Sequence, residues 1–141
     1  MKAGQVVDTG PLVALFDKGD TYHQAAQEFV RKNRFPMFTT LAVVTEVEYL
    51  LDFSIHAQAD FLEWLVRGSL YIVSIEREEL AKIKALMEKF RDLPMDFADA
   101  TLVAACEKLG TPRIATVDKD FQVYRYFGKK KFSLAPGFGL H

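Results

Sequence analysis

The chain has 141 residues, half of them hydrophobic (50%), and its 18 basic and 19 acidic residues give a net charge of −1. A chain of this length can bury roughly 68% of its unfolded surface, so residues 1–141 are expected to form a single domain. The balanced charge excludes an overall attraction to nucleic acid, so any such contact must come from a local patch. The single cysteine, Cys106, excludes an internal disulfide and fits a small core residue in a reducing compartment.

No apolar stretch typical of a secretory signal precedes Asp8, and no run approaches the ~20 apolar residues of a membrane span. We therefore expect a soluble protein of the cytoplasm that does not contact a membrane.

The first half of the chain alternates short apolar segments with helical patterns. We expect a strand at residues 5–7, followed by a helix whose first turn holds Pro11, with Gly10 at its cap. A second helix is expected from Asp20 through residue 32. A strand at 37–40 and a helix at 41–53, capped by Thr40, follow it. His23 is expected to be a local structural or a surface residue.

The second half continues this alternation. The pattern predicts a helix from Ala57, a strand at 70–75 and a helix with its apolar stripe between residues 80 and 90. A helix at 97–109 and a strand at 113–116 are expected next. A short helix at 120–127 and a candidate fifth strand at 131–134 complete the prediction. Strands that alternate with helices predict an α/β fold, a parallel sheet of four to five strands covered on both faces. Binding sites in such sheets lie beyond the carboxyl ends of the strands.

Acidic residues from four segments fall at this expected edge. Asp8 follows the first strand, and Glu46 lies in the helix after the second. Asp96 and Asp99 begin the helix before the strand at 113–116, and Asp118 and Asp120 follow that strand.

Several of these acids also have local explanations. Asp96 and Asp99 have the spacing of an N-cap and its reciprocal partner, and Asp118 suits a turn. Either Glu46 or Glu48 is expected to be a solvated surface residue, and the more apolar helical neighbours of Glu46 favour it as the inward one.

The acids taken together predict a cation. Two carboxylates about 4 Å apart repel by roughly 4 kcal/mol at an effective dielectric near 20, so a cluster must bind protons or a metal. Oxygen ligands alone favour Mg²⁺ or Mn²⁺ over zinc. Such an ion can lower the pKa of a bound water and stabilise a leaving oxygen, which predicts phosphodiester hydrolysis.

The segments VVDTGPLVALFD, TLAVVTEVEYLL, DLPMDFADATLVAA and IATVDKDF resemble the four acidic motifs of PIN-domain proteins, most closely the toxin ribonucleases of the VapC type. The resemblance runs from about Val6 to Phe121. It implies a three-layer α/β/α sandwich and Mg²⁺- or Mn²⁺-dependent endonucleolytic cleavage of RNA. It also implies a small antitoxin partner and a homodimer.

By this resemblance, the catalytic and metal-binding acids are Asp8, Glu46, Asp99 and Asp118. The supporting residues are Thr9, Asp96, Thr116 and Asp120, and Asp120 is an alternative to Asp118 as the fourth acid. Lys119 and Arg125 lie near the acids and are candidates for contacts with RNA phosphates. The basic runs at residues 31–34 and 129–131 are expected to be solvated.

Two other functions stay open. Another Mg²⁺-dependent phosphohydrolase is one, although a haloacid-dehalogenase-like phosphatase needs an acid where this chain has Gly10. A non-catalytic interaction module with the PIN fold is the other. Covalent catalysis is not expected, because neither Ser74 nor Cys106 has a His or acid partner at a useful spacing.

Overall fold

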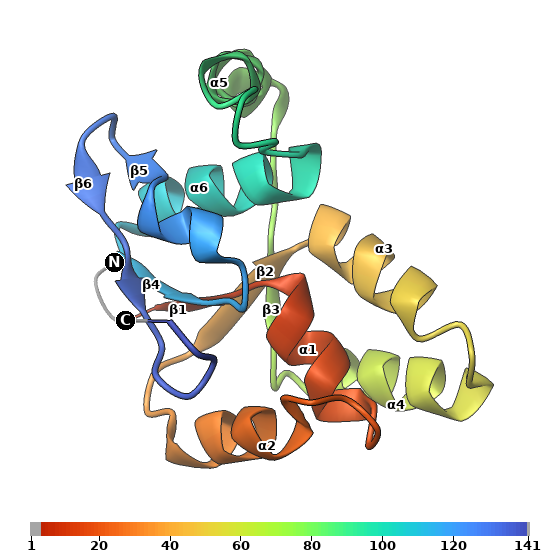
Figure 1. Ribbon diagram of the computed structural model, residues 1–141. Helices are drawn as coiled ribbons and strands as arrows, with labels where there is room; N and C mark the ends of the chain where they lie inside the picture. Colours follow the sequence, from red (N-terminus) through yellow and green to blue (C-terminus); the bar gives the residue numbers. More distant parts are fainter. Residues whose placement is uncertain (1–3, 141) are drawn as a thin grey trace.

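The computed structural model describes residues 4–140 (Figure 1). Its main sheet has five strands in the order β3-β2-β1-β4-β7, and every neighbouring pair is parallel. The strands are β1 (Gln5–Val7), β2 (Met37–Thr40), β3 (Tyr71–Val73), β4 (Arg113–Ala115) and β7 (Ser133–Leu134). The predicted parallel sheet and its candidate fifth strand are therefore confirmed.

Helices cover both faces of this sheet. They are α1 (Thr9–Phe16), α2 (His23–Lys32), α3 (Leu41–Leu50), α4 (Ile55–Val66), α5 (Arg77–Lys89) and α6 (Phe97–Leu109). Figure 1 shows α5 and α6 on one face and α1, α2 and α4 on the other, which confirms the three-layer α/β/α sandwich. No helix within residues 4–140 is long and apolar enough to cross a membrane.

The central strand β1 is covered on both sides. Val6 pairs with Phe38 of β2 and with Ile114 of β4, and all three residues of β1 are buried. Short apolar strands with no polar alternation are typical of parallel sheets packed between helices. Because β1 is central, its carboxyl end lies in the middle of the sheet edge where ligands are expected.

The cap of α1 differs from the prediction. The helix begins at Thr9 with Asp8 as its N-cap, and Gly10 lies inside the helix. A Cβ atom at Gly10 would stand 2.4 Å from Cγ2 of Val117, so the glycine allows α1 to lie against the segment that follows β4.

The start of α2 also differs. Asp20 forms a turn, in which its side chain accepts from the Tyr22 amide (2.8 Å) and its carbonyl accepts from the His23 amide (3.0 Å). The helix therefore begins at His23. The expected structural role of His23 is confirmed, since its Nδ1 lies 2.7 Å from the carbonyl oxygen of Ala14 and joins α2 to α1.

The predicted helix at 120–127 is wrong. Only a 3-10 turn, η1 (Lys119–Gln122), forms there, and the chain then enters an antiparallel hairpin of β5 (Arg125–Tyr126) and β6 (Lys130–Lys131). The ring of Tyr126 packs on Phe132 with centroids 5.3 Å apart.

Other boundaries shift by a few residues. The helix predicted at 41–53 ends at Leu50, the helix predicted from Ala57 begins at Ile55, the strand predicted at 70–75 covers 71–73, and the fifth strand covers 133–134. Thr40 stands at the N-cap of α3 as predicted, but its side chain does not bond an amide of that helix. Its hydroxyl is instead hydrogen-bonded to the hydroxyl of Thr101 in α6 at 2.8 Å.

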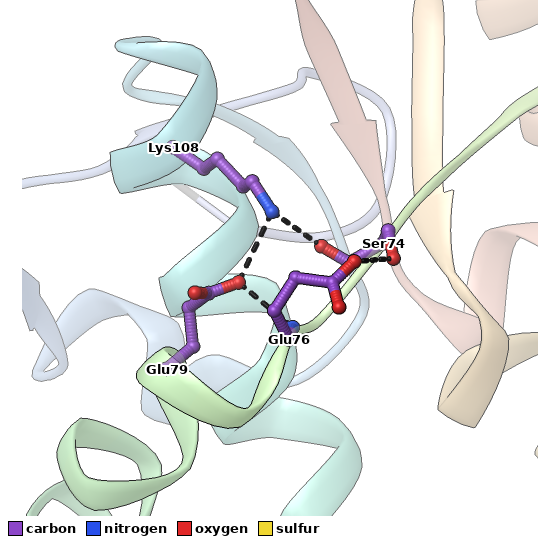
Figure 2. A network of polar contacts seen from close by, with 4 residues as sticks. All are labelled: Ser74, Glu76, Glu79 and Lys108. Atoms are coloured by element: carbon purple, nitrogen blue, oxygen red, sulfur yellow. Dashed lines mark hydrogen bonds and ion pairs between the residues drawn. The ribbon is translucent and has the colours of Figure 1, made fainter.

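A polar network fixes α5 against α6 (Figure 2). The Lys108 ammonium, near the end of α6, donates to the carbonyl of Ser74 (2.7 Å) and to the carboxylate of Glu79 (3.1 Å). Glu79 also accepts from the amide of Glu76, which caps α5. One ammonium thus ties the segment after β3 to both helices of this face.

Candidate active site

Asp8 lies where β1 ends and α1 begins. Its Oδ1 accepts from the amide of Thr9 (2.7 Å) and its Oδ2 accepts from the hydroxyl of Thr116 (2.7 Å). The side chain is buried, with 6% of its surface exposed. Asp8 is therefore a helix cap and also a buried carboxylate at the sheet edge.

Thr116 connects Asp8 to the acid that follows β4. Its hydroxyl donates to Asp8 and accepts from the amide of Asp118 (2.9 Å). Asp118 caps the η1 turn, since its Oδ1 accepts from the Asp120 amide (2.9 Å). Asp118 and Asp8 therefore share a hydrogen-bond partner, and Asp120 lies one step further along the turn.

Asp96 and Asp99 form the reciprocal cap of α6. The Asp99 amide donates to Asp96 Oδ1 (2.8 Å), and the Asp96 amide donates to Asp99 Oδ2 (3.2 Å). The local explanation is confirmed, yet it does not remove Asp99 from the cluster. The pKa of Asp99 is raised to about 8 by burial, next by the charge of Asp8 and then by that of Asp96.

Glu46 and Glu48 are both half-buried on α3, so the prediction that one of them is a solvated surface residue is wrong. The charge of Glu46 helps to raise the pKa of Asp8, which associates it with the cluster. One carboxylate oxygen of Glu48 is buried without a hydrogen-bond partner in the described residues, and its backbone carbonyl accepts from the Gln58 side chain of α4 (2.8 Å). Burial raises the pKa of Glu48.

The electrostatics of the cluster disfavour full ionisation. Burial raises the pKa of Asp8 to about 6, although hydrogen bonds from Thr116 and Thr9 oppose the shift, and the charges of Asp118 and Glu46 add to it. Burial also raises the pKa of Asp118. These carboxylates are close enough to repel one another, as the order of the acids along the sheet edge predicts.

Tyr124 is a residue near the cluster that the sequence did not reveal. Its buried hydroxyl donates to the carbonyl of Leu93 (2.7 Å), and burial, followed by the charge of Asp99, raises its pKa. An aromatic residue in an apolar segment predicts only a core position, so no pattern could have linked Tyr124 to the acids.

The donor set fits a hard divalent cation. All candidate ligands are carboxylates, and Thr9 adds a buried hydroxyl that has no hydrogen-bond partner in the described part of the chain. Within residues 4–140, however, no three acids lie close enough together to hold an ion as they stand. Binding of an ion by three of these acids would therefore require them to move closer together, while one oxygen each of Asp99 and Asp118 is held by a backbone amide.

The two candidate RNA-binding cations differ in their surroundings. Lys119 is exposed beside Asp118. Arg125 is half-buried, and its Nη1 donates to the carbonyls of Gln122, Val123 and Tyr124. Arg125 therefore supports the end of η1, which leaves fewer donors for a phosphate.

A cavity of about 530 Å³ lies at the opposite end of the strands. Its lining includes the first residues of three strands, Gln5, Arg113 and Ser133, together with Phe29 and Phe35. None of the clustered acids reaches this mainly apolar cavity, so the chemistry indicated by the carboxylates belongs to the other edge of the sheet.

A family model described as the PIN domain matches residues 6–125, the segment that carries all of the clustered acids. The chain belongs to the PIN-domain family. This PIN domain is 25% identical over 134 residues to ribonuclease VapC26 of Mycobacterium tuberculosis, a match that covers 93% of this chain and 99% of that protein.

The fold of the PIN domain also matches a solved structure. The crystal structure of Mycobacterium tuberculosis VapC20, described as a toxin that cleaves the sarcin–ricin loop, superposes with a TM-score of 0.78. The match covers 88% of this chain and 97% of VapC20, at 19% identity. At this identity the similarity shows a shared fold.

Proposed function

We propose that this PIN domain, over residues 1–141, is a metal-dependent endoribonuclease and the toxin of a toxin–antitoxin pair. The observation that carries the proposal is the cluster of carboxylates from four segments at the carboxyl edge of the sheet, with the pKa of Asp8 raised to about 6 and that of Asp99 to about 8. Similarity to ribonuclease VapC26 over nearly the whole chain supports RNA as the substrate.

In this proposal Asp8, Glu46 and Asp99 hold Mg²⁺ or Mn²⁺, and Asp118 is the fourth acid. Asp118 is preferred to Asp120 because its charge helps to raise the pKa of Asp8, and its backbone amide donates to the Thr116 hydroxyl that bonds Asp8. When bound, such an ion lowers the pKa of a water and stabilises the charge that develops on phosphate oxygens.

The remaining groups orient the reaction. Asp118 Oδ1 is held by the Asp120 amide, which leaves Oδ2 to accept the proton of the attacking water. Its raised pKa suits a general base better than that of an ordinary aspartate. Thr9, Thr116 and Asp96 position the carboxylates. The water oxygen attacks phosphorus, and the P–O bond to the leaving nucleotide breaks.

The expected partners follow from the same proposal. A small antitoxin would silence the enzyme in the cytoplasm, where its RNA substrate is found. The homodimer would bury apolar side chains that are exposed on or beside α3 and α4, which are Tyr49, Leu50, Phe53, Ile55, Leu62 and Val66.

The test is to incubate the purified protein, free of antitoxin, with total RNA in Mg²⁺, in Mn²⁺ or in EDTA, beside the Asp8→Asn variant. Discrete fragments that require the metal and disappear in the variant are expected. Asn can still accept from the Thr9 amide, so the variant keeps the cap and removes the charge.

Two other outcomes would contradict the proposal. Metal-dependent stability without cleavage of any RNA would favour the non-catalytic interaction module. Hydrolysis of a phosphomonoester but not of RNA would favour another Mg²⁺-dependent phosphohydrolase.

A further inference from the structure

The β5–β6 hairpin (residues 125–131) carries an aromatic ring in a conformation that favours glycine. Phe127 has a φ of 48°, the one positive φ at a non-glycine position within residues 4–140, and Gly128 follows with a φ of 77°. The left-handed region is strained for a bulky side chain. Half of the Phe127 surface is nevertheless exposed (50%), so core packing does not account for the ring.

The strained turn is held firmly against two helices. The Phe127 amide donates to Glu107 Oε2 of α6 at 2.6 Å. The Glu107 side chain, only 6% exposed, also forms an ion pair with Lys82 of α5. The Lys82 ammonium in turn lies 5.5 Å from the centroid of the Phe127 ring. The β5–β6 hairpin lies beside α6 (Figure 1), and the bond to Glu107 holds the turn that carries the ring.

Positive charge lies close to this ring, both in space and in the residues that follow it. Lys129, Lys130 and Lys131 are exposed, and none of them takes part in an ion pair with an acid of the described residues. The Lys130 ammonium lies 5.5 Å from the centroid of Phe127. Residues 125–131 contain no acid. In a chain with a net charge of −1, the hairpin is therefore a local basic patch.

The hairpin and the acidic cluster lie along the same helix. Asp99 is in the first turn of α6 and Glu107 is eight residues later, which corresponds to about 12 Å of helix at 1.5 Å per residue. A single nucleic-acid strand that passes through the cluster could reach the hairpin within a few nucleotides.

We propose that the β5–β6 hairpin binds a single-stranded segment of the RNA substrate next to the cleavage site, with a base stacked on Phe127 and phosphates bound by Lys129, Lys130 and Lys131. An exposed ring flanked by ammonium groups is the combination with which proteins hold single strands, because every base has a face that can stack. A duplex keeps its bases stacked on one another and cannot use the ring. The substrate class rests on the proposed function.

The test measures binding separately from cleavage. Fluorescence anisotropy in EDTA, where a metal-dependent nuclease cannot cut, would follow a labelled single-stranded RNA of about 12 nucleotides and the same sequence as a duplex. Phe127→Gly removes the ring and suits the positive φ. Phe35→Gly, which removes another exposed phenylalanine from a loop outside the hairpin and outside the proposed dimer interface, is the matched control. Circular dichroism would verify that each variant folds.

Phe127→Gly is expected to weaken binding of the single strand by roughly 5- to 150-fold, with little change for the duplex or in Phe35→Gly. Replacing Lys129, Lys130 and Lys131 with Gln should make the salt dependence of binding shallower, by about 0.7 in log K per log salt for each phosphate that is no longer bound. With Mg²⁺, Phe127→Gly should raise KM for a single-stranded substrate and change kcat little.

Unchanged affinity of Phe127→Gly for the single strand would overturn the proposal, even if the wild type cleaves RNA. An equal loss for strand and duplex would also overturn it, because phosphate contact alone would then explain binding. Ring-dependent binding without cleavage in any metal would support the hairpin site and contradict the proposed nuclease. A failure of the hairpin site and a failure of the proposed nuclease therefore give different results.

Discussion

At the scale of single residues, Asp8 shows how a carboxylate can be hydrogen-bonded at both oxygens and still be unfavourable as an anion. The bonds from Thr9 and Thr116 lower its pKa, but burial raises it by more, and Asp118 and Glu46 add repulsion. A pKa raised from 3.8 to about 6 lowers the free energy of unfolding by about 3 kcal/mol above pH 6. Without a cation, Asp8 therefore destabilises the fold at neutral pH.

Removing this charge should stabilise the metal-free protein. We expect Asp8→Asn to raise the free energy of unfolding at pH 8 by up to about 3 kcal/mol while it abolishes cleavage, because a buried charge is lost and the cap is kept. Urea unfolding in EDTA measures the change. If Asp8 were only a cap, Asn would leave the stability nearly unchanged.

The stability of the metal-free protein should fall as pH rises. The pKa values of Asp8 and Asp99 are raised in the folded state, to about 6 and about 8, so the folded state binds more protons than the unfolded state from about pH 4 to pH 8. Between pH 6 and pH 8 the expected loss is about 1–2 kcal/mol, allowing for the partial exposure of Asp99.

Urea unfolding at a series of pH values in EDTA would show this slope, and Asp99→Asn should flatten it between pH 6 and pH 8. A wild type whose stability rises over that range, or a variant with the same slope, would contradict the assigned pKa shifts.

At the scale of elements, the contact between α1 and the segment after β4 holds two of the acids at one edge. Gly10 permits it, because a Cβ there would stand 2.4 Å from Cγ2 of Val117. An interior helical Gly→Ala change normally stabilises by about 1 kcal/mol, whereas forcing a methyl into a packed site costs about 1–3 kcal/mol.

We therefore expect Gly10→Ala to lower the free energy of unfolding by about 1–2 kcal/mol and to reduce cleavage, since Asp8 and Asp118 are displaced. In a Val117→Ala background the same change should be neutral or stabilising, and a double-mutant cycle by urea unfolding measures this coupling. Additive effects would show that the contact does not set the position of α1.

Strands and helices with a clear hydrophobic pattern could be predicted from the sequence. The buried strand at residues 5–7 and the strand at 113–116 are apolar runs between turn residues, and the order of strands and helices then places the acids at one edge. Helix starts were less predictable. The Asp8 cap and the Asp20 turn depend on which of several polar residues bonds an amide, and more than one choice satisfies the same pattern.

The β5–β6 hairpin could not be predicted, because tertiary contacts decide it. Its turn uses Phe127 at a position where sequence rules expect glycine or asparagine, and Glu107, 20 residues away, holds the turn in place. The burial of one Glu48 carboxylate oxygen could not be predicted either, because helical spacing does not show which neighbouring segments cover a side chain. Side-chain environments of this kind arise only once distant segments have packed.

At the scale of the whole molecule, the sheet brings together carboxylates that are far apart in the sequence. Asp8, Glu46, Asp99 and Asp118 come from separate segments, and the charges of Asp118 and Glu46 raise the pKa of Asp8 while that of Asp8 raises the pKa of Asp99. The hairpin adds positive charge along α6. The fold thus places an acidic edge and a basic, aromatic patch along the same helix.

The central claim is that this edge binds a divalent cation through its carboxylates. Isothermal titration calorimetry with Mn²⁺ at pH 7, in two buffers of different ionisation enthalpy, gives both affinity and proton release. The wild type is expected to bind Mn²⁺ and to release close to one proton, mainly from Asp99, because metal ligands must be deprotonated. Asp99→Asn should bind more weakly and release few protons, and Asp8→Asn should bind at least about 10-fold more weakly. No binding of Mn²⁺ by the wild type, or the same affinity in both variants, would contradict a cation site formed by these carboxylates.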